Sequence, residues 1–148
     1  MVKKIISKQE YCIGCGLCEV YCIVQHSKSK DPTKAYNKEK PRPISRVRLE
    51  MNKPFSFAIQ CRHCDDAPCV AACLTGAMHK DKQTGLVSHN PDKCMGCWTC
   101  VMVCPYGAIK IDAQNKVITK CDQCFELEIP VCVANCPNGA LECKEMKS

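Results

Sequence analysis

Short stretches in which apolar and polar residues alternate recur along the second half of the chain. Residues 77–90 predict two short strands around a turn at 82–85, which is a typical hairpin signal. Residues 109–111 and 116–119 repeat this pattern around a second polar turn. Earlier in the chain, residues 46–51 also alternate and predict an edge strand. No apolar run approaches the roughly 18 residues of a membrane span.

Large apolar residues are scarce, whereas cysteine is abundant. Of 148 residues, 17 are Cys and only 30 are Leu, Ile, Val or Phe. A chain of this composition lies at the edge of what folds around a hydrophobic core alone. We therefore expect groups bound to the cysteines to supply much of the folding free energy. The composition excludes a large enzyme domain, an ordinary helical bundle and a disordered tail.

The start of the chain does not predict secretion. Lys3 and Lys4 are followed by only two apolar residues, Ile5 and Ile6, which is too short for a signal peptide. We therefore expect a cytoplasmic protein. Reducing conditions there keep thiols free, so dense cysteine indicates metal ligands. A small secreted disulfide scaffold is the alternative.

Sixteen of the cysteines form four regularly spaced sets. The sets are Cys12-x2-Cys15-x2-Cys18-x3-Cys22, Cys61-x2-Cys64-x4-Cys69-x3-Cys73, Cys94-x2-Cys97-x2-Cys100-x3-Cys104 and Cys121-x2-Cys124-x7-Cys132-x3-Cys136. The last three sets are followed by the same Gly-Ala-apolar tail, which begins at Gly76, Gly107 and Gly139. Cys143 stands outside the sets, and we expect it to be a buried or free thiol.

This spacing is typical of iron–sulfur ligands. Three cysteines spaced two residues apart let a tight loop hold three corners of a cube, and the fourth lies roughly 6 Å further along a helical turn. In two-cluster ferredoxins this fourth Cys ligates the other cluster. The Pro that follows it, as at Pro105 and Pro137, stops the helix. Four all-thiolate zinc sites are the alternative, but zinc ribbons use cysteine pairs with long spacers.

The net charge of +6 suggests nucleic-acid binding, but the excess is local. Residues 28–48 contain eight Lys or Arg and two acidic residues, and the rest of the chain is balanced. Four oxidised [4Fe–4S] clusters with thiolate ligands would bring the total charge to about −2. The basic excess is therefore better explained as counter-charge than as a phosphate footprint. Pro32, Pro41 and Pro43 predict a loop here, which is either solvated or a docking surface for an acidic partner.

At these motifs the chain resembles the four-cluster ferredoxin subunits of the dimethyl-sulfoxide-reductase iron–sulfur family. The wider second spacing, from Cys61 to Cys69, is specific to that family. Residues 26–31 and 97–100 are similar to the small iron–sulfur subunit associated with carbon monoxide dehydrogenase. The ferredoxin-like subunit of tungsten aldehyde oxidoreductases is a near second.

The resemblance implies an α+β fold of two pseudo-symmetric bacterial-ferredoxin-like modules, each holding two [4Fe–4S] clusters. We expect one compact body over residues 1–148, with an inner module at about 60–110. Residues 1–59 together with 111–148 would form the outer module, and residues 27–50 a basic loop insertion. The C-terminal extension and membrane anchor of some relatives are not seen in the sequence, so we do not expect membrane docking.

The resemblance also implies a nested pairing of the ligands. The four clusters would be held by Cys61, Cys64, Cys69 and Cys104; by Cys94, Cys97, Cys100 and Cys73; by Cys12, Cys15, Cys18 and Cys136; and by Cys121, Cys124, Cys132 and Cys22. The sequence supports the inner pair independently, because only 20 residues separate Cys73 from Cys94 and they form the predicted hairpin. Pro is missing after Cys22 and Cys73, which affects the local geometry but not the ligands.

A cluster with four thiolate ligands leaves no iron position for a substrate. The chain also lacks a Gly-rich phosphate loop, a Ser/His/Asp arrangement and paired carboxylates. We therefore predict an electron-transfer subunit without a catalytic site, working in an anaerobic setting. It would pass single electrons between carbon monoxide dehydrogenase, our first expectation, and a flavin NAD(P) oxidoreductase or a hydrogenase.

Several alternatives to this function stay open. A tungsten aldehyde oxidoreductase, a formate dehydrogenase or a hydrogenase could be the partner instead. The protein could also be a freely diffusing polyferredoxin with many clients. We expect no nucleic-acid partner and no membrane span.

A few other side chains are candidates for supporting roles. His63 lies between two ligands, where it would either donate a hydrogen bond to a cluster sulfur or be structural. Trp98 follows a ligand, and we expect it to serve in packing more than as an electron stepping-stone. Met95 and Met102 are expected in the core. The other histidines lack the spacing of metal ligands.

Overall fold

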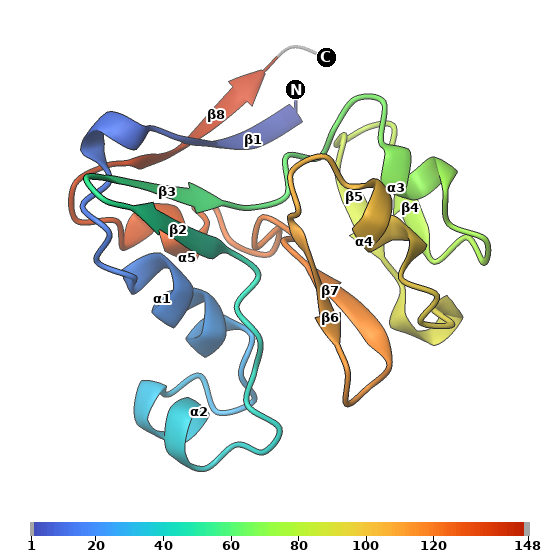
Figure 1. Ribbon diagram of the computed structural model, residues 1–148, viewed down its shortest axis with the longest axis horizontal. Coiled ribbons are helices and arrows are strands. Elements are labelled where there is room, and N and C mark those ends of the chain that lie inside the picture. Colours follow the sequence, from blue (N-terminus) through green and yellow to red (C-terminus); the bar gives the residue numbers. More distant parts are fainter. Residues whose placement is uncertain (1, 147–148) are drawn as a thin grey trace.

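The computed structural model describes residues 2–146, in which short helices alternate with short strands (Figure 1). The strands are β1 (Val2–Ser7), β2 (Arg48–Asn52), β3 (Phe55–Ile59), β4 (Met78–Lys80), β5 (Val87–His89), β6 (Ile109–Asp112), β7 (Val117–Lys120) and β8 (Leu141–Met146). The helices are α1 (Leu17–Gln25), α2 (Pro32–Asn37), α3 (Pro68–Ala71), α4 (Thr99–Val103) and α5 (Val131–Ala134), with 3-10 turns at Gln9–Tyr11 and Pro91–Lys93. Among these helices none is long and apolar enough to cross a membrane. The predicted mixture of helix and strand is confirmed.

Both hairpins predicted from alternation are present, as β4–β5 and β6–β7. An aspartate organises each turn. The Asp81 carboxylate accepts hydrogen bonds from the Gln83 amide at 2.9 Å and the Thr84 hydroxyl at 2.7 Å. Asp112 accepts in the same way from the amides of residues 114 and 115. These short-range contacts explain why the sequence alone revealed the hairpins.

Two further strand pairs complete the described ladders, all of them antiparallel and two-stranded. The strand predicted at 46–51 begins two residues later, at Arg48, and pairs with β3, which the sequence analysis did not predict. β1 pairs with β8, so segments from opposite ends of the chain lie side by side (Figure 1). Ile5 is buried in this ladder opposite the half-buried, unbridged thiol of Cys143.

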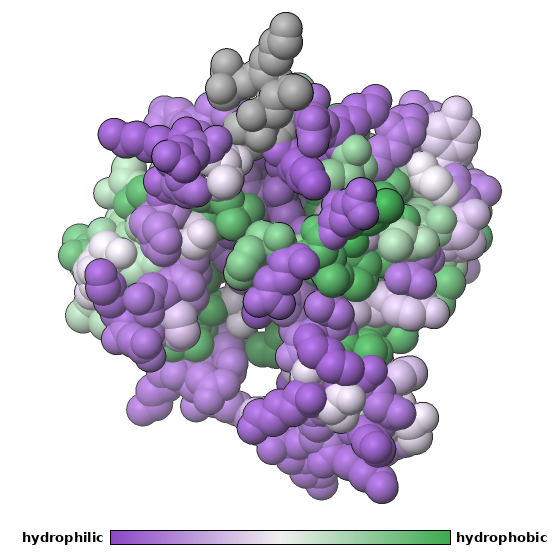
Figure 2. Space-filling model, turned by 180° about the vertical axis from the view of Figure 1, so that it is seen from behind, coloured by the Kyte–Doolittle hydropathy of each residue, from purple (hydrophilic) through white to green (hydrophobic). Residues whose placement is uncertain are grey.

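The loop predicted for the basic insertion is only partly correct, because the insertion contains helix α2 and ends in β2. Pro32 occupies the first turn of α2, where its missing N–H is not needed. The Asp31 carboxylate caps the helix by accepting a hydrogen bond from the Lys34 amide at 2.9 Å. Pro41 and Pro43 follow the helix in irregular chain. Hydrophilic side chains cover this protruding segment (Figure 2).

The helices pack as two separate pairs. α1 contacts α5, and α3 contacts α4. In Figure 1 the first pair lies with β1, β2, β3 and β8 on one side, the second pair with β4 and β5 on the other, and β6–β7 between them. The first and fourth cysteine sets thus share one side of the molecule, and the second and third share the other.

The apolar core is thin, as its composition predicted. The largest side chains that are fully buried are His63, Val47 and Val87. Two buried clusters are rich in cysteine, and both are in contact with the half-buried Cys104. Thiols therefore occupy positions where a typical domain of this size would place Leu or Phe.

Candidate metal centres

Each cysteine set spans a short helix: Cys22 lies within α1, whereas Cys73, Cys104 and Cys136 follow the ends of α3, α4 and α5. The structure brings three cysteines of one set near the last cysteine of another. We number these quartets by the set that supplies three of the residues: quartet 1 is Cys12, Cys15, Cys18 and Cys136; quartet 2 is Cys61, Cys64, Cys69 and Cys104; quartet 3 is Cys94, Cys97, Cys100 and Cys73; quartet 4 is Cys121, Cys124, Cys132 and Cys22.

Quartets 1 and 3 occupy corresponding places on the two sides of the molecule. The four cysteines of quartet 1 line one small pocket, beside Tyr11 and Ile13. Those of quartet 3 line another, beside Met95 and Trp98. Burial raises the pKa of the Cys18 thiol to about 11. In each pocket thiols from two distant segments converge on a shared space.

Quartet 2 is recognised from the electrostatic effects of its members on one another. The pKa of the Cys69 thiol is raised to about 11, first by burial and then by the charges of Cys61, Cys104 and Cys64. The pKa of the Cys64 thiol is raised by burial and by Cys61 and Cys104. The four thiols therefore lie close together, and such a group favours a bound cation, which holds thiols as thiolates.

Quartet 4 is the most buried. Burial and the charges of Cys22, Cys124 and Cys18 raise the pKa of the Cys132 thiol to about 12. The pKa of Cys121 is raised well above its ordinary value, first by burial and also by Cys132, Cys22 and Cys61. The effects of Cys18 and Cys61 show that quartet 4 adjoins both quartet 1 and quartet 2.

Exposure differs between the quartets. Cys15 of quartet 1 and Cys97 of quartet 3 are the exposed residues among the sixteen, and the rest are buried or half-buried. Trp98 packs against the apolar cluster that contains Cys69 and Cys100, as expected. The prediction that Met95 and Met102 lie in the core is wrong, because they are 64% and 84% exposed.

The repeated Gly-Ala tail positions main-chain amides on the sulfurs. The Cys136 Sγ accepts a hydrogen bond from the Ala140 amide at 3.2 Å, and the Cys73 Sγ from the Met78 amide at 3.4 Å. Gly139, with φ +63°, turns the chain so that the next amide faces back toward the cysteine. Hydrogen bonds to ligand sulfurs favour the reduced form of a cluster and so raise its potential.

Cys22 has no such tail, and the basic insertion supplies its amide instead. The Arg46 amide donates to the Cys22 Sγ at 3.1 Å. Burial raises the pKa of the Cys22 thiol, but hydrogen bonds with His26 and from the Arg46 amide outweigh it, so the net shift is downward. The insertion therefore does more than extend into solvent: one residue of it completes the surroundings of quartet 4.

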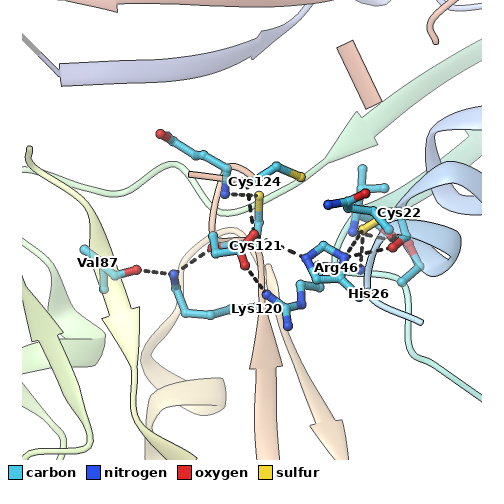
Figure 3. Close-up of polar contacts among 12 residues, drawn as sticks. Cys22, His26, Arg46, Val87, Lys120, Cys121 and Cys124 are labelled. Carbon is cyan, nitrogen blue, oxygen red and sulfur yellow. Dashed lines mark hydrogen bonds and ion pairs between the residues drawn. The ribbon is translucent and has the colours of Figure 1, made fainter. Parts of the chain in front are cut away.

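His26 lies beside Arg46 and Cys22 in this arrangement (Figure 3), and Asp122 contacts both His26 and Arg46. The His26 Nδ1 donates to the Cys22 carbonyl at 2.8 Å, while its Nε2 lies 3.4 Å from the Asp122 carboxylate, which also binds the Arg46 guanidinium. Burial lowers the pKa of His26, but the hydrogen bonds with Asp122 and Cys22 outweigh this effect and raise the pKa to about 9. The ligand atoms of His26, Asp122 and Cys124 all lie within 4.8 Å of one another. Since Cys124 belongs to quartet 4, we regard His26 and Asp122 as the surroundings of that quartet.

His63 shows that the residues present fit a bound cluster. Its side chain is fully buried, and its Nδ1 accepts a hydrogen bond from the Val87 amide at 2.9 Å. The proton of the neutral imidazole is then on Nε2, which has no partner among the described residues. A buried donor without an acceptor is costly. Because His63 lies between Cys61 and Cys64, a sulfur of a cluster held there would be a suitable acceptor.

Comparison with known proteins identifies the family. The family model described as a 4Fe-4S dicluster domain matches residues 53–146. The chain belongs to this family. Membership decides between the iron–sulfur clusters and the zinc sites that the sequence left open: the cysteines hold iron–sulfur clusters.

Two curated relatives align with almost the whole length of this chain. It is 36% identical over 159 residues to the electron transport protein HydN of Escherichia coli (strain K12), covering 97% of this chain and 88% of HydN. It is 31% identical over 153 residues to the thiosulfate reductase electron transfer subunit PhsB of Salmonella typhi, covering 93% of this chain and 73% of PhsB. The predicted resemblance to ferredoxin-like electron-transfer subunits is thereby confirmed at the level of the family.

A solved structure shares the fold. A chain of the active site complex BamBC of benzoyl coenzyme A reductase superposes with a TM-score of 0.52 at 22% sequence identity. The match covers 97% of this chain and 76% of that one. At this identity the likeness concerns the arrangement of the backbone alone.

Proposed function

We propose that the protein relays single electrons through four [4Fe–4S] clusters, one in each quartet. The observation that supports this most directly is the convergence of cysteines from distant sets. In every quartet the last cysteine of one set meets three cysteines of a different set, as in two-cluster ferredoxins. The two helix pairs, α1 with α5 and α3 with α4, are the elements that bring them together. The chain is then two ferredoxin-like modules, with quartets 1 and 4 in one and quartets 2 and 3 in the other.

The neighbours of each quartet give the order of the relay. Quartet 4 adjoins quartet 1 through Cys18 and quartet 2 through Cys61. Quartets 2 and 3 contribute to a common buried cluster that contains Cys69 and Cys100. The order is therefore 1, 4, 2, 3, and the exposed cysteines Cys15 and Cys97 belong to its two ends. Electrons would enter at one end and leave at the other.

The residues of the chain bind and tune the clusters and perform no step on a substrate. The clusters, when bound, supply one-electron redox chemistry. The amides of Arg46, Met78 and Ala140 donate to ligand sulfurs and so stabilise added negative charge. All sixteen cysteines are assigned as ligands, so no position is left for a substrate. This assignment makes the protein an electron carrier and not the catalytic partner.

The partner we propose is the catalytic subunit of a redox enzyme. HydN is named as an electron transport protein, and PhsB as the electron transfer subunit of a thiosulfate reductase. Our prediction of carbon monoxide dehydrogenase rests on residues 26–31 and 97–100 alone. Exposed apolar side chains near each end, Ile13 beside Cys15 and Met95 beside Cys97, offer contact surfaces for an electron donor and an acceptor.

Iron analysis and native purification test the proposal. Protein prepared without oxygen should contain about 16 iron and 16 sulfide per chain, as four cubes require. Stoichiometric zinc or half this iron content would contradict it. A stable complex captured from native extract with a redox enzyme supports the subunit role, and the partner in it decides whether carbon monoxide dehydrogenase is correct. Recovery of a lone monomer that reduces several acceptors favours the polyferredoxin.

A further inference from the structure

Lys120 is a buried cation at the junction between quartets 2 and 4. It is the last residue of β7, directly before the first cysteine of the fourth set, and it is only 5% exposed. Its Nζ donates hydrogen bonds to two main-chain carbonyls, those of Val87 and, at 2.8 Å, Cys121 (Figure 3). Its stem thus crosses from the β6–β7 hairpin to β5, and its charged end lies between the two sides of the molecule.

No carboxylate pairs with this ammonium among residues 2–146. The nearest acidic residue along the chain, Asp122, is engaged by Arg46 and His26. Carbonyl groups satisfy two of the three N–H donors but do not neutralise the charge. A buried charge without a counter-ion is strongly disfavoured. The surroundings of Lys120 are therefore incomplete without an anion.

The thiolates of the two neighbouring quartets are the anions within reach of this charge. Val87, whose carbonyl accepts from the Lys120 Nζ, belongs to the same buried cluster as Cys69 of quartet 2. Cys121 of quartet 4 is the next residue, and its carbonyl binds the ammonium. The Val87 amide in turn donates to the Nδ1 of His63, between Cys61 and Cys64 of quartet 2, so one residue of β5 connects Lys120 to that loop.

We propose that Lys120 is the shared counter-cation of the two interior clusters and raises their reduction potentials. The inference rests on the proposed function, because it requires clusters in quartets 2 and 4. Reduction adds one negative charge to a cluster that is already anionic. A fixed positive charge in a medium of low dielectric favours that reduced form. Lys120 therefore eases the crossing of the electron between the two modules, where it must pass from quartet 4 to quartet 2.

Lys80 provides a matched control with the same type of hydrogen bonds. Its Nζ donates to the carbonyls of Cys64 at 3.1 Å and Asp65 at 2.8 Å. Unlike Lys120, its side chain is partly exposed and lies 3.7 Å from the Asp65 carboxylate. Its charge is therefore both screened by water and offset by an acid. Comparing the two lysines separates the effect of an unpaired buried charge from that of the hydrogen bonds to main-chain carbonyls.

The experiment uses the full chain, purified without oxygen, and redox titration followed by electron paramagnetic resonance. Lys120→Gln keeps a hydrogen-bond donor and removes the charge, so we expect an interior cluster to become at least tenfold harder to reduce, a shift of about 59 mV to lower potential. The charge-conserving Lys120→Arg should stay close to the wild type. Lys80→Gln should shift every potential far less than Lys120→Gln, and the clusters of quartets 1 and 3 should keep theirs in all variants.

The inference is overturned if Lys120→Gln holds four clusters at wild-type potentials, or if Lys80→Gln gives the same shift. Lys120→Met is a second neutral variant in case Lys120→Gln does not assemble. Loss of the interior clusters from both neutral variants, with all four kept in Lys120→Arg, supports the counter-cation. If Lys120→Arg loses the interior clusters as well, the role of Lys120 lies in its hydrogen bonds to the two carbonyls, and the inference is rejected. A wild-type protein without four clusters would instead contradict the proposed function, so the two failures are distinguishable.

Discussion

Single polar atoms beside the sulfurs decide how the quartets behave. His63 combines an imidazole that fixes the edge of β5 with a buried Nε2–H that has no partner in the described chain. Its backbone has φ +45°, a left-handed conformation that only a few per cent of non-glycine residues adopt, although His tolerates it better than most. A residue held in this conformation, fully buried and between two ligands, is positioned by its surroundings for a specific contact.

His63→Asn tests this contact without adding backbone strain, because Asn tolerates positive φ. The shorter side chain leaves the Val87 amide unpaired, and we expect the free energy of unfolding to fall by about 1–3 kcal/mol. Chemical denaturation measures this loss. The potential of the quartet 2 cluster should also fall, because a hydrogen bond to its sulfur disappears. Exposed His79 on β4 is the control, and a His79→Asn change that matched His63→Asn in both measurements would reject the role.

The sequence identified the sixteen candidate ligands because their spacing is local. It could not identify the contact of His26 and Arg46 with Asp122, since the partners are far apart along the chain and no spacing rule connects them. His63 was recognised as a candidate from its place between two cysteines. The sequence left its role open, because only packing shows which ring nitrogen is satisfied.

In the pairing that we propose, short helices carry ligands to two clusters at once. Cys18 and Cys22 lie one turn apart on α1 and belong to quartets 1 and 4. The same geometry recurs where α3 links Cys69 to Cys73. Helix α1 therefore fixes the distance between two clusters, and the pairing can be examined one ligand at a time.

Cys22→Ser should damage the cluster held with Cys121, Cys124 and Cys132 and spare the one held with Cys12, Cys15 and Cys18. The reason is that the fourth ligand of each set belongs to the neighbouring cluster. Iron content and electron paramagnetic resonance of the reduced protein would show which signal changes. Cys136→Ser is the counterpart and should affect quartet 1 instead. The reverse pattern in the two variants would refute the nested pairing.

The loop between Cys94 and Cys97 depends on a glycine. Gly96 has φ +71°, and a Cβ there would lie 2.5 Å from the Lys116 carbonyl oxygen. Gly96→Ala should lower the free energy of unfolding by about 2 kcal/mol or more, through the left-handed conformation and the clash together. Thermal unfolding measures the loss, and the iron of quartet 3 should be the first lost. Gly16→Ala shares the positive φ but has no atom within 4 Å, so an equal effect there would exclude the clash.

Elements with local signals were predictable, and those without them were not. The hairpins β4–β5 and β6–β7 are closed by turn residues a few positions apart. The pairing of β1 with β8 joins segments about 140 residues apart, so no local pattern marks it. The sequence does not predict helix α2, because Pro32 is in general a helix breaker, whereas Pro is favoured in the first turn.

At the scale of the whole molecule, cysteine makes up half of one buried cluster, five of its ten residues. The same cluster combines these cysteines with a few medium-sized side chains such as Ile5, Val47 and Leu141. Bound clusters would therefore contribute folding free energy directly, as metals do in other small domains with weak cores. The composition predicted this dependence. It could not predict the partner, which is recognised by the surface and not by the core.

Removal of iron should unfold most of the chain. An iron chelator with an oxidant, followed by reduction of the thiols, leaves the cysteines without the metal that holds distant segments together. We expect loss of near-ultraviolet circular dichroism and of hydrogen-exchange protection throughout residues 2–146. Protection retained at the level of the holoprotein would contradict a folding role for the clusters. Reconstitution with iron and sulfide should restore both signals.

The ladder between β1 and β8 has a consequence for biosynthesis. During translation β1 leaves the ribosome first, yet its partner strand becomes available only after residues 141–146 have emerged. Helix α1 likewise waits for α5, whereas α3 and α4 can meet much earlier. The half containing α3 and α4 can therefore mature on the nascent chain, and the other half closes around it last. Cellular machinery that delivers iron would meet the two halves at different times.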